Sequence, residues 1–250
     1  MIIAVGAWRG AGATTTALLL AAHLAAADAS GAWLIEADPA GGTLAGRMQL
    51  APHTIGGLER VAFPSQRAAS AEALSAVAHG DRLRIITAPA DPFRAFACHQ
   101  PRVLWAPALR ELDRPVVVDV GRLRAGSPVG QLLTHADHVL VVTAPETSAA
   151  VSATEWLQAG GRVSPAEPGL PDGKARLVVV DSPGGVGFAR TTLVSELGSR
   201  CAGWMPWDPA VVDLVHRGAV ATDRRVRRSP LAQAISQMLP SFAFDHSSSR

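Results

Sequence analysis

Residues 5 to 16 most constrain the fold, because they join a short apolar run to a helix through a glycine-rich loop. The stretch reads VGAWRGAGATTT and is followed by an Ala- and Leu-rich segment. Such a loop gathers backbone N–H groups around an anion, and the N-terminus of the following helix adds partial positive charge. The common phosphate-binding motif, G-x-x-x-x-G-K-[ST], also has a lysine before the Ser/Thr. Ala13 stands there instead, so the sequence predicts a phosphate loop without its main cation.

The composition indicates a folded chain with almost no lysine. Of its 250 residues 48% are hydrophobic and 18% are charged, which is typical of a well-packed protein. Lys174 is the only lysine, so only an arginine can replace the missing cation near the loop. The net charge of +2 does not by itself indicate a nucleic-acid partner.

The two cysteines and the first helix bear on the cellular compartment. Cys98 and Cys201 lie far apart, with no C-x-x-C pair or histidine cluster, which fits a reducing cytosol and argues against a cysteine metal site. The apolar run from Ala17 to Ala27 is about half the ~20 residues of a membrane span, and no basic segment precedes it. We therefore expect a buried helix, no integral membrane segment and a cytoplasmic protein.

Buried strands alternate with helices along the chain. This alternation predicts one doubly wound α/β domain over residues 1–240, with a mostly parallel sheet of about seven strands and helices on both faces. We expect a disordered tail at residues 241–250. The expected strands cover residues 1–5, 32–37, 83–87, 115–121, 136–143, 175–181 and 202–205. The expected helices cover residues 14–27, 69–78, 103–112, 146–159, 188–197, 210–217 and 230–239.

Two aspartates follow predicted strands. Asp38 comes after the strand at 32–37, where a Mg²⁺ ligand or a water-orienting group would lie beside a phosphate loop. The alternative is a simple Asp-Pro turn. Asp119 ends a β-branched run, the pattern of a Walker B strand whose aspartate holds Mg²⁺ or its water shell. The alternative is an ordinary buried strand, since such runs occur in any parallel sheet.

Together these residues resemble the ParA/MinD-type family of P-loop proteins with a deviant Walker A loop. The similar segments follow in family order over nearly the whole chain. They are Gly10-x-Gly12-x-Thr14-Thr15, the D-x-D-P-x-G-like residues 36–41, the strand ending in Asp119, the A-D-x-V-L-x-V-T-x-P-E-like residues 136–146, the G-x-I-P-x-D-like residues 203–208, and Ser229-Pro230-Leu231.

The loop departs from the family pattern at three positions. The family's signature lysine falls on Trp8, its first glycine on Arg9 and its phosphate-loop lysine on Ala13. An alanine at the last position resembles the CpaE/TadZ-like branch, whose members position pilus-secretion machinery at a cell pole. The resemblance thus implies a cytoplasmic protein that partners recruit to a pole or membrane complex.

The resemblance also implies a site for ATP or ADP with Mg²⁺. The Thr14 hydroxyl and Asp119 would hold Mg²⁺, and Asp38 matches the residue that polarises the attacking water. Asp181 stands at the adenine-reading position, and Pro206 and Trp207 match the loop that flanks adenine. Arg9 is the residue that could contact phosphate in place of a lysine. The backbone amides around the β-phosphate would come from Gly10, Ala11, Gly12, Ala13, Thr14 and Thr15.

The missing lysines favour a pseudo-ATPase, because one electrostatic donor to the transition state is worth ~10²–10³ in rate. We therefore expect a homodimeric positioning or scaffold protein that acts through protein partners. The alternative is an active ParA-type ATPase that binds DNA non-specifically as an ATP dimer. A basic cluster bears on this choice, either as a contact with DNA or anionic lipid or as a solvated connection. It comprises Arg224, Arg225, Arg227 and Arg228.

Overall fold

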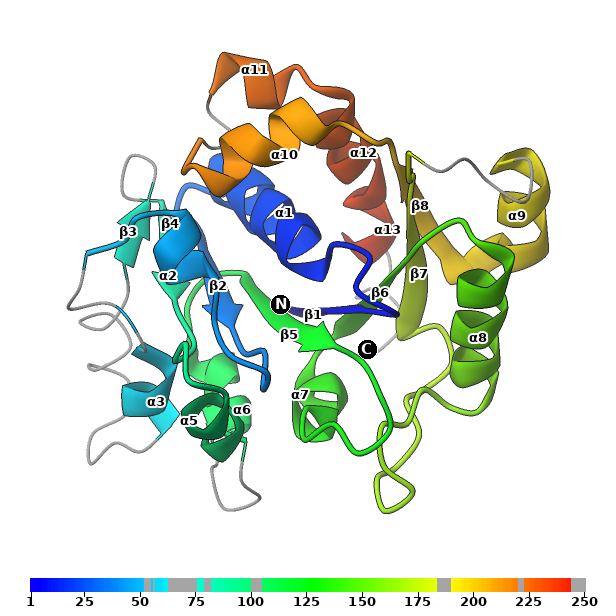
Figure 1. Ribbon diagram of the computed structural model, residues 1–250, viewed down its shortest axis with the longest axis horizontal. Helices are drawn as coiled ribbons and strands as arrows, with labels where there is room; N and C mark the ends of the chain where they lie inside the picture. The colour runs from blue at the N-terminus through cyan, green and yellow to red at the C-terminus, as the bar shows by residue number, and fades with distance from the viewer. Residues whose placement is uncertain are drawn as a thin grey trace.

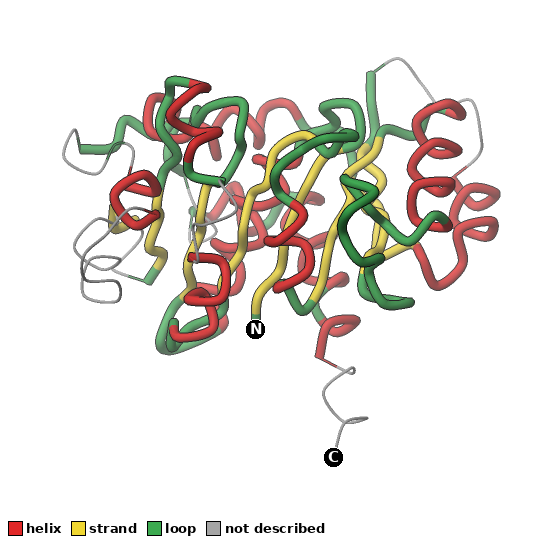
Figure 2. Tube along the Cα trace, turned by 90° about the horizontal axis from the view of Figure 1, so that it is seen from below, coloured by secondary structure: helices red, strands yellow, loops and turns green. Residues whose placement is uncertain are grey.

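The computed structural model describes residues 1–51, 55, 57–62, 76–78, 82–99, 105–183, 190–219 and 223–243. Its described strands form one sheet in the order β3-β4-β2-β5-β1-β6-β7-β8, with helices on both faces (Figures 1 and 2). The strands are β1 (Ile2–Ala7), β2 (Ala32–Glu36), β3 (Ala76–Ala78), β4 (Leu83–Ile86), β5 (Val116–Arg122), β6 (His138–Thr143), β7 (Ala175–Val180) and β8 (Cys201–Met205).

The helices divide between the two faces of the sheet. The α-helices are α1 (Ala13–Ala27), α2 (Leu44–Arg47), α3 (Gly57–Ala62), α5 (Pro92–Ala97), α6 (Trp105–Ala108), α7 (Gly130–His135), α8 (Thr147–Gln158), α9 (Arg190–Leu197), α10 (Pro209–His216), α11 (Arg224–Arg227), α12 (Pro230–Met238) and α13 (Pro240–Ala243), with 3₁₀ turns at η2 (Leu109–Glu111) and η3 (Gly198–Arg200). One apolar layer joins α1, α10 and α12 to the sheet, and the other joins α6, α7, α8 and α9 to its opposite face.

The alternation of side chains along β1 explains the two layers. Ile3 and Val5 pack toward α1, whereas Ile2 and Ala4 pack into the opposite layer, and all four are buried. A strand covered on both faces reads as a continuous apolar run, as expected for a parallel sheet. The predicted doubly wound, mostly parallel sheet is therefore confirmed. Its seven long strands pair in parallel, and the short β3 pairs antiparallel with β4.

Three predicted segments need correction. Residues 76–78, expected at the end of a helix, form β3, and the rest of that predicted helix lies outside the described residues. Residues 105–111 form α6 followed by the 3₁₀ turn η2 instead of one longer helix. At the C-terminus, α13 continues past residue 240 and its Phe242 is buried against His138, so the predicted tail starts too early. Residues 244–250 lie outside the described part of the chain.

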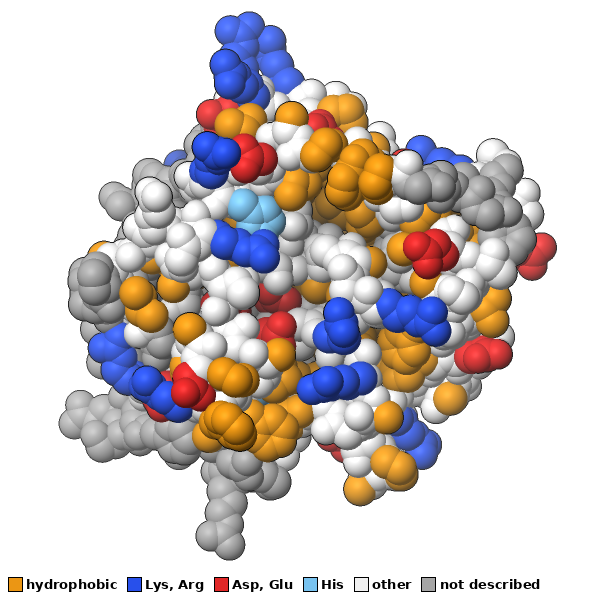
Figure 3. All heavy atoms as spheres, viewed as in Figure 1, with side chains coloured by type: hydrophobic (Ala, Val, Ile, Leu, Met, Phe, Trp, Pro, Cys, Tyr) orange, Lys and Arg blue, Asp and Glu red, His pale blue; other side chains and the backbone are white. Residues whose placement is uncertain are grey.

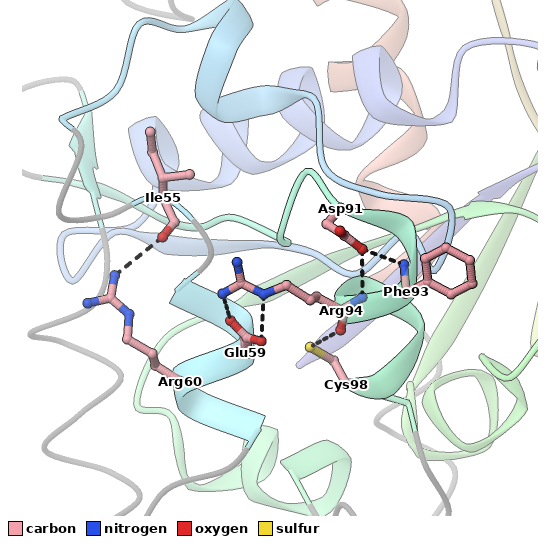
Figure 4. A network of polar contacts seen from close by, with 7 residues as sticks. All are labelled: Ile55, Glu59, Arg60, Asp91, Phe93, Arg94 and Cys98. Carbon is pink, nitrogen blue, oxygen red and sulfur yellow. Dashed lines mark hydrogen bonds and ion pairs between the residues drawn. The ribbon is translucent and has the colours of Figure 1, made fainter.

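A small polar network fixes α5 against α3 at one edge of the molecule (Figure 4). Asp91 caps α5 by accepting hydrogen bonds from the backbone N–H groups of Phe93 (2.8 Å) and Arg94 (3.1 Å). The Arg94 guanidinium forms an ion pair with Glu59 of α3. The Phe93 ring points away from these contacts and is 86% exposed. Both helices stand beside the end of β4 at which the loop after Ile86 begins.

Candidate functional site

The loop between β1 and α1 leaves the N-terminus of α1 open. Its backbone has positive φ at Arg9 (61°), Gly10 (76°) and Gly12 (95°). Successive backbone turns of this kind point N–H groups into a concave site that suits an anion. Gly12 is the N-cap of α1 and supplies no side-chain cap, and the first turn carries no acidic residue. The 15-residue helix α1 can therefore accept an anion at this end.

The two positions where lysines are missing are occupied by packed side chains. Ala13 is 5% exposed and belongs to the apolar layer under α1. Trp8 packs on Trp156 of α8, with ring centroids 5.7 Å apart and ring planes tilted by 41°. The Trp156 indole N–H in turn donates to the backbone oxygen of Arg162 at 2.7 Å. Trp8 thus contributes to the attachment of α8 and presents no cation to the loop.

Asp119 lies at the buried centre of the site. Its side chain is fully buried, and its Oδ1 accepts a hydrogen bond from the Gly121 N–H at 3.1 Å. Its Oδ2 is also buried and has no hydrogen-bond partner in the described structure. Burial raises the pKa of Asp119 to about 7, while the Thr14 hydroxyl and the Gly121 N–H oppose that rise. The Thr14 hydroxyl, which the resemblance pairs with Asp119 for Mg²⁺, thus acts on this carboxylate in the described structure.

Asp38 forms the predicted turn. Together with Glu36 and Asp119 it makes up the acidic group beside the loop. Its Oδ1 accepts from the Ala40 N–H at 2.8 Å, and its carboxylate packs directly on Gly121, which leaves no room for a Cβ there. Burial raises its pKa, opposed by the Ala40 N–H and then by Arg124 and Arg122. The structure thus contains the turn, and the role of Asp38 in a site stays a prediction. The two arginines were not among the predicted site residues.

Glu36 is a buried carboxylate whose contacts the sequence did not predict. Its Oε1 accepts from the N–H groups of Thr43 (2.6 Å) and Leu44 (2.9 Å), and its Oε2 accepts from the Ala88 N–H (3.1 Å). Burial raises its pKa, and these hydrogen bonds oppose the rise. Because Glu36 is paired in register with Asp119 on β5, it fixes the segment carrying Asp38 beside the Walker B-like strand. Its three hydrogen bonds indicate a structural role.

A cavity of about 380 Å³ opens beside the loop, within the size range of small-ligand pockets. It brings together the predicted residues of the loop and of the segments after β7 and β8, but neither Asp38, Asp119, Ala13 nor Thr14 lines it. The predicted residues that line it are Arg9, Gly10, Ala11, Gly12, Thr15, Asp181, Pro206 and Trp207. Trp207 is 50% exposed, so its indole ring can cover a ligand in this cavity.

Asp181 at the cavity wall has an indole partner. The Trp204 indole N–H donates to Asp181 Oδ1 at 2.7 Å, which holds the carboxylate at the end of β7. The guanidinium of Arg190 lies 5.3 Å from the centre of the Trp204 ring, a cation–π contact. One carboxylate oxygen of Asp181 is therefore engaged by the protein, and the residue lines the cavity.

A histidine links the loop to two other helices. His216, at the end of α10, lies 2.7 Å from the Thr15 hydroxyl through Nε2, and the Arg47 guanidinium lies 2.9 Å from its Nδ1. Arg47 can only donate, so Nδ1 is the acceptor and Nε2–H donates to Thr15. Burial lowers the pKa of His216, and Arg47 lowers it further. Neither of these two contacts was predicted, because His216 lies 201 residues from Thr15 and 169 from Arg47.

The basic cluster lies apart from the cavity. Arg224, Arg225 and Arg227 belong to α11 and Arg228 follows it; all four are exposed around the buried Val226. Basic side chains, here arginines, gather on the surface at the top of the molecule, where α11 lies (Figures 1 and 3). The cluster is thus a solvated, convex surface in the described structure and does not line the cavity.

Comparisons with known proteins bear on the fold. No protein-family model matches the chain, and no curated protein sequence matches it. Solved structures do. A ParA family ATPase from Chlorobium tepidum TLS is 15% identical over 95% of this chain and 97% of its own, with a TM-score of 0.72. MinD from Pyrococcus horikoshii OT3, complexed with Mg-ADP, is 14% identical over 99% and 96%, with a TM-score of 0.71. A MinC:MinD complex from Aquifex aeolicus matches at 17% identity over 97% and 95%, with a TM-score of 0.64.

The likeness covers nearly the full length of both chains in each comparison. In the described residues, no helix combines the length and the apolar character needed to cross a bilayer. Because the sequence identities are below 20%, this structural likeness establishes the fold alone, and the chemistry must be argued from the site. The chain has the fold of the ParA and MinD P-loop ATPases.

Proposed function

We propose that this chain is a ParA/MinD-like positioning or scaffold protein of the CpaE/TadZ type that binds ATP or ADP with Mg²⁺ and hydrolyses ATP slowly or not at all. One observation carries the proposal: the buried aspartate of the site is present, but the two positions that the resemblance aligns with lysines hold uncharged side chains. Asp119 Oδ2 is buried and unpartnered beside an open loop, whereas Trp8 and Ala13 are packed into apolar surroundings.

The residues present fit Mg²⁺ and a nucleotide. Within the described ranges, no three His, Cys, Asp or Glu side chains form a metal site by themselves, so phosphate and water oxygens would complete the coordination. Thr14 and Asp119 would hold the ion, and the ion would neutralise phosphate charge. The amides of residues 10–15 would surround the β-phosphate. Trp207 and Pro206 would cover the base, and Asp181 would accept a hydrogen bond from its amino group.

Slow turnover follows from the chemistry of the loop. Charge grows on the phosphate oxygens during phosphoryl transfer, and each lost electrostatic donor costs ~10²–10³ in rate. Asp38 would orient the attacking water, but Trp8 cannot supply the positive charge of the family's signature lysine. We infer that the chain acts as a homodimer whose surface binds protein partners.

The likeness to MinD in a complex with MinC supports a role that depends on a protein partner. In this proposal the chain is cytoplasmic and is recruited to a cell pole or membrane complex of a secretion system. The alternative is an active ParA-type ATPase that binds DNA non-specifically. The exposed arginines of α11 are the observation that favours it.

The experiment is calorimetry of the purified chain with Mg·ADP and Mg·ATP, together with phosphate release and sedimentation. Nucleotide binding with turnover at least 100-fold below an active ParA ATPase, and a dimer, are the expected results. Rapid turnover together with salt-sensitive DNA binding, both lost in Arg9→Ala, would establish the alternative. A stable dimer without nucleotide affinity would leave a scaffold whose P-loop is purely structural.

A further inference from the structure

An arginine outside the loop lies directly against it. A Cβ built on Gly10 would stand 2.8 Å from Arg122 Nη2, 3.8 Å from its Cζ and 3.9 Å from its Nε. All three atoms belong to the guanidinium group, so the charged end of Arg122 rests on the bare Cα of Gly10. Arg122 is the last residue of β5 and follows Asp119 by three positions.

The end of β5 curls to bring Arg122 to this place. The register between β1 and β5 shifts after Val5, so that Gly6 pairs with Gly121 and Ala7 with Arg122. Gly121 has φ 66°. Two residues later, Leu123 packs on Gly6, where a Cβ would stand 2.6 Å from Leu123 Cγ. The three residues after Val120 therefore wrap around the start of the loop. This backbone path directs the Arg122 side chain to Gly10.

The Arg122 guanidinium is available to a ligand. It is exposed, and in the described structure it forms no hydrogen bond or ion pair. Its charge, together with that of Arg124, acts on the Asp38 carboxylate, so it stands on the side of the loop where the acidic group lies. Arg9, the cation suggested by the sequence, differs in this respect, because its Nη1 donates to Ser148 Oγ of α8 at 3.3 Å.

We propose that Arg122 is the phosphate-binding cation of this loop and contacts the terminal phosphates of a nucleoside di- or triphosphate in place of the lysine missing at Ala13. The inference rests on the nucleotide site of the proposed function. Two independent features point to a ligand at this place: the uncapped N-terminus of α1, and the fully buried, unpartnered Asp119 Oδ2.

An arginine at position 122 can reach phosphate more readily than a lysine placed at position 13 could. Its planar fork can donate two parallel hydrogen bonds to two phosphate oxygens. Because Arg122 belongs to a central strand, its backbone is held by β1 on one side of the site. Ala13, by contrast, is packed in the apolar layer under α1 and leaves no polar path for a longer side chain.

The test is calorimetric titration of the full chain with Mg·ADP, Mg·ATP and AMP. The variants are Arg122→Ala, Arg122→Gln, Arg122→Lys and, as the matched control, Arg200→Ala. Arg200 lies in η3 just before β8, at the opposite end of the sheet, and its removal changes the net charge equally. We expect Arg122→Ala and Arg122→Gln to weaken ADP and ATP binding about 10- to 100-fold, the scale of a charged hydrogen bond. Arg122→Lys should lose less, and Arg200→Ala nothing.

AMP distinguishes a phosphate contact from a general change in the site. Its affinity should be the same in all five proteins, because Arg122 would contact phosphates that AMP lacks. Equal losses for AMP and ADP, or ADP affinity unchanged in Arg122→Ala, would overturn the role of Arg122 while leaving the nucleotide site intact. Failure of the unmodified chain to bind ADP or ATP would overturn the nucleotide site itself, and Arg122 with it.

Discussion

Arg9 occupies a backbone conformation that suits glycine. Its φ of 61° lies in the left-handed region, and the resemblance aligns it with a glycine of the loop. A side chain in that region costs roughly 1–2 kcal/mol, which the neighbouring contacts of the loop must offset. Strain of this kind at a ligand loop indicates that the backbone shape matters more than the identity of the residue.

This strain can be measured by comparing Arg9→Gly with Arg9→Ala, since both remove the guanidinium. Glycine relieves the left-handed strain but adds chain entropy to the unfolded state, so Arg9→Gly should be the more stable by about 1 kcal/mol. Denaturant unfolding checks this. At Arg200, which does not have a positive φ, the alanine variant should instead be more stable than the glycine variant. A more stable Arg9→Ala would mean that the loop relaxes to negative φ in solution.

His99 should make stability depend on pH. Burial lowers its pKa from 6.5 to about 4, and its Nε2 is buried without a hydrogen-bond partner among the described residues. The unfolded chain therefore binds more protons between these values, so the free energy of unfolding should fall as pH drops from about 6.5 to 4. The total loss is on the order of 3 kcal/mol.

The measurement is urea unfolding of the wild type and of His99→Gln at several pH values. The difference between the two isolates His99 from the buried acids, whose raised pKa values act in the opposite direction. Above pH 6.5 the difference in unfolding free energy between the wild type and His99→Gln should no longer change with pH. His135→Gln, a change at a partly exposed histidine, should retain the wild-type slope. An unchanged slope in His99→Gln would show that this ring is hydrated in solution.

At the scale of elements, the site is assembled from the carboxyl ends of neighbouring strands and from three helices tied to the loop. Trp8 connects the loop to α8, and His216 connects it to α10 and, through Arg47, to α2. These contacts fix the loop from opposite sides. Trp8, which the resemblance aligns with the family's signature lysine, thus makes a structural contact.

A double-mutant cycle on Trp8 and Trp156 tests this replacement. Both tryptophans to alanine, singly and together, should give a coupling energy of about 0.5–1.5 kcal/mol, the usual worth of an aromatic pair beyond its buried area. The control pairs Trp8 with the exposed Phe93 of α5, a helix that lies across the molecule from α8 (Figure 1), and this pair should be additive within roughly 0.5 kcal/mol. Additivity of the tryptophan pair would contradict a packed Trp8.

The sequence predicts the long elements well for physical reasons that are local. Runs such as Val116–Val118 mark buried strands, and Ser229 with Pro230 marks the start of α12, where Ser229 Oγ accepts from the Ala232 N–H as a cap. The contact of Arg122 with Gly10 is different, since it depends on a register shift between two strands distant in sequence. The same holds for the link between His216 and Thr15, for which no local pattern exists.

At the scale of the whole molecule, the exposed arginines of α11 separate the two candidate functions. If the chain is a scaffold, Mg·ATP should not promote DNA binding. We expect the wild type and a variant with Arg224, Arg225, Arg227 and Arg228 all changed to alanine to show the same weak anisotropy change with duplex DNA at about 150 mM salt. The DNA-binding alternative would be supported if, for the wild type, the plot of log binding constant against log salt concentration were steeper by about 0.9 for each phosphate contact.

The position of β1 has a consequence for how the chain is made. Ile2 pairs with Val116 of β5 and Ile3 with His138 of β6, so both partners lie more than 100 residues later in the chain. This central strand therefore cannot pair on either side until β5 has been translated. Non-local pairing of this kind slows folding and leaves apolar strands exposed to aggregation. The same strand that positions the phosphate loop thus makes folding depend on late closure of the sheet.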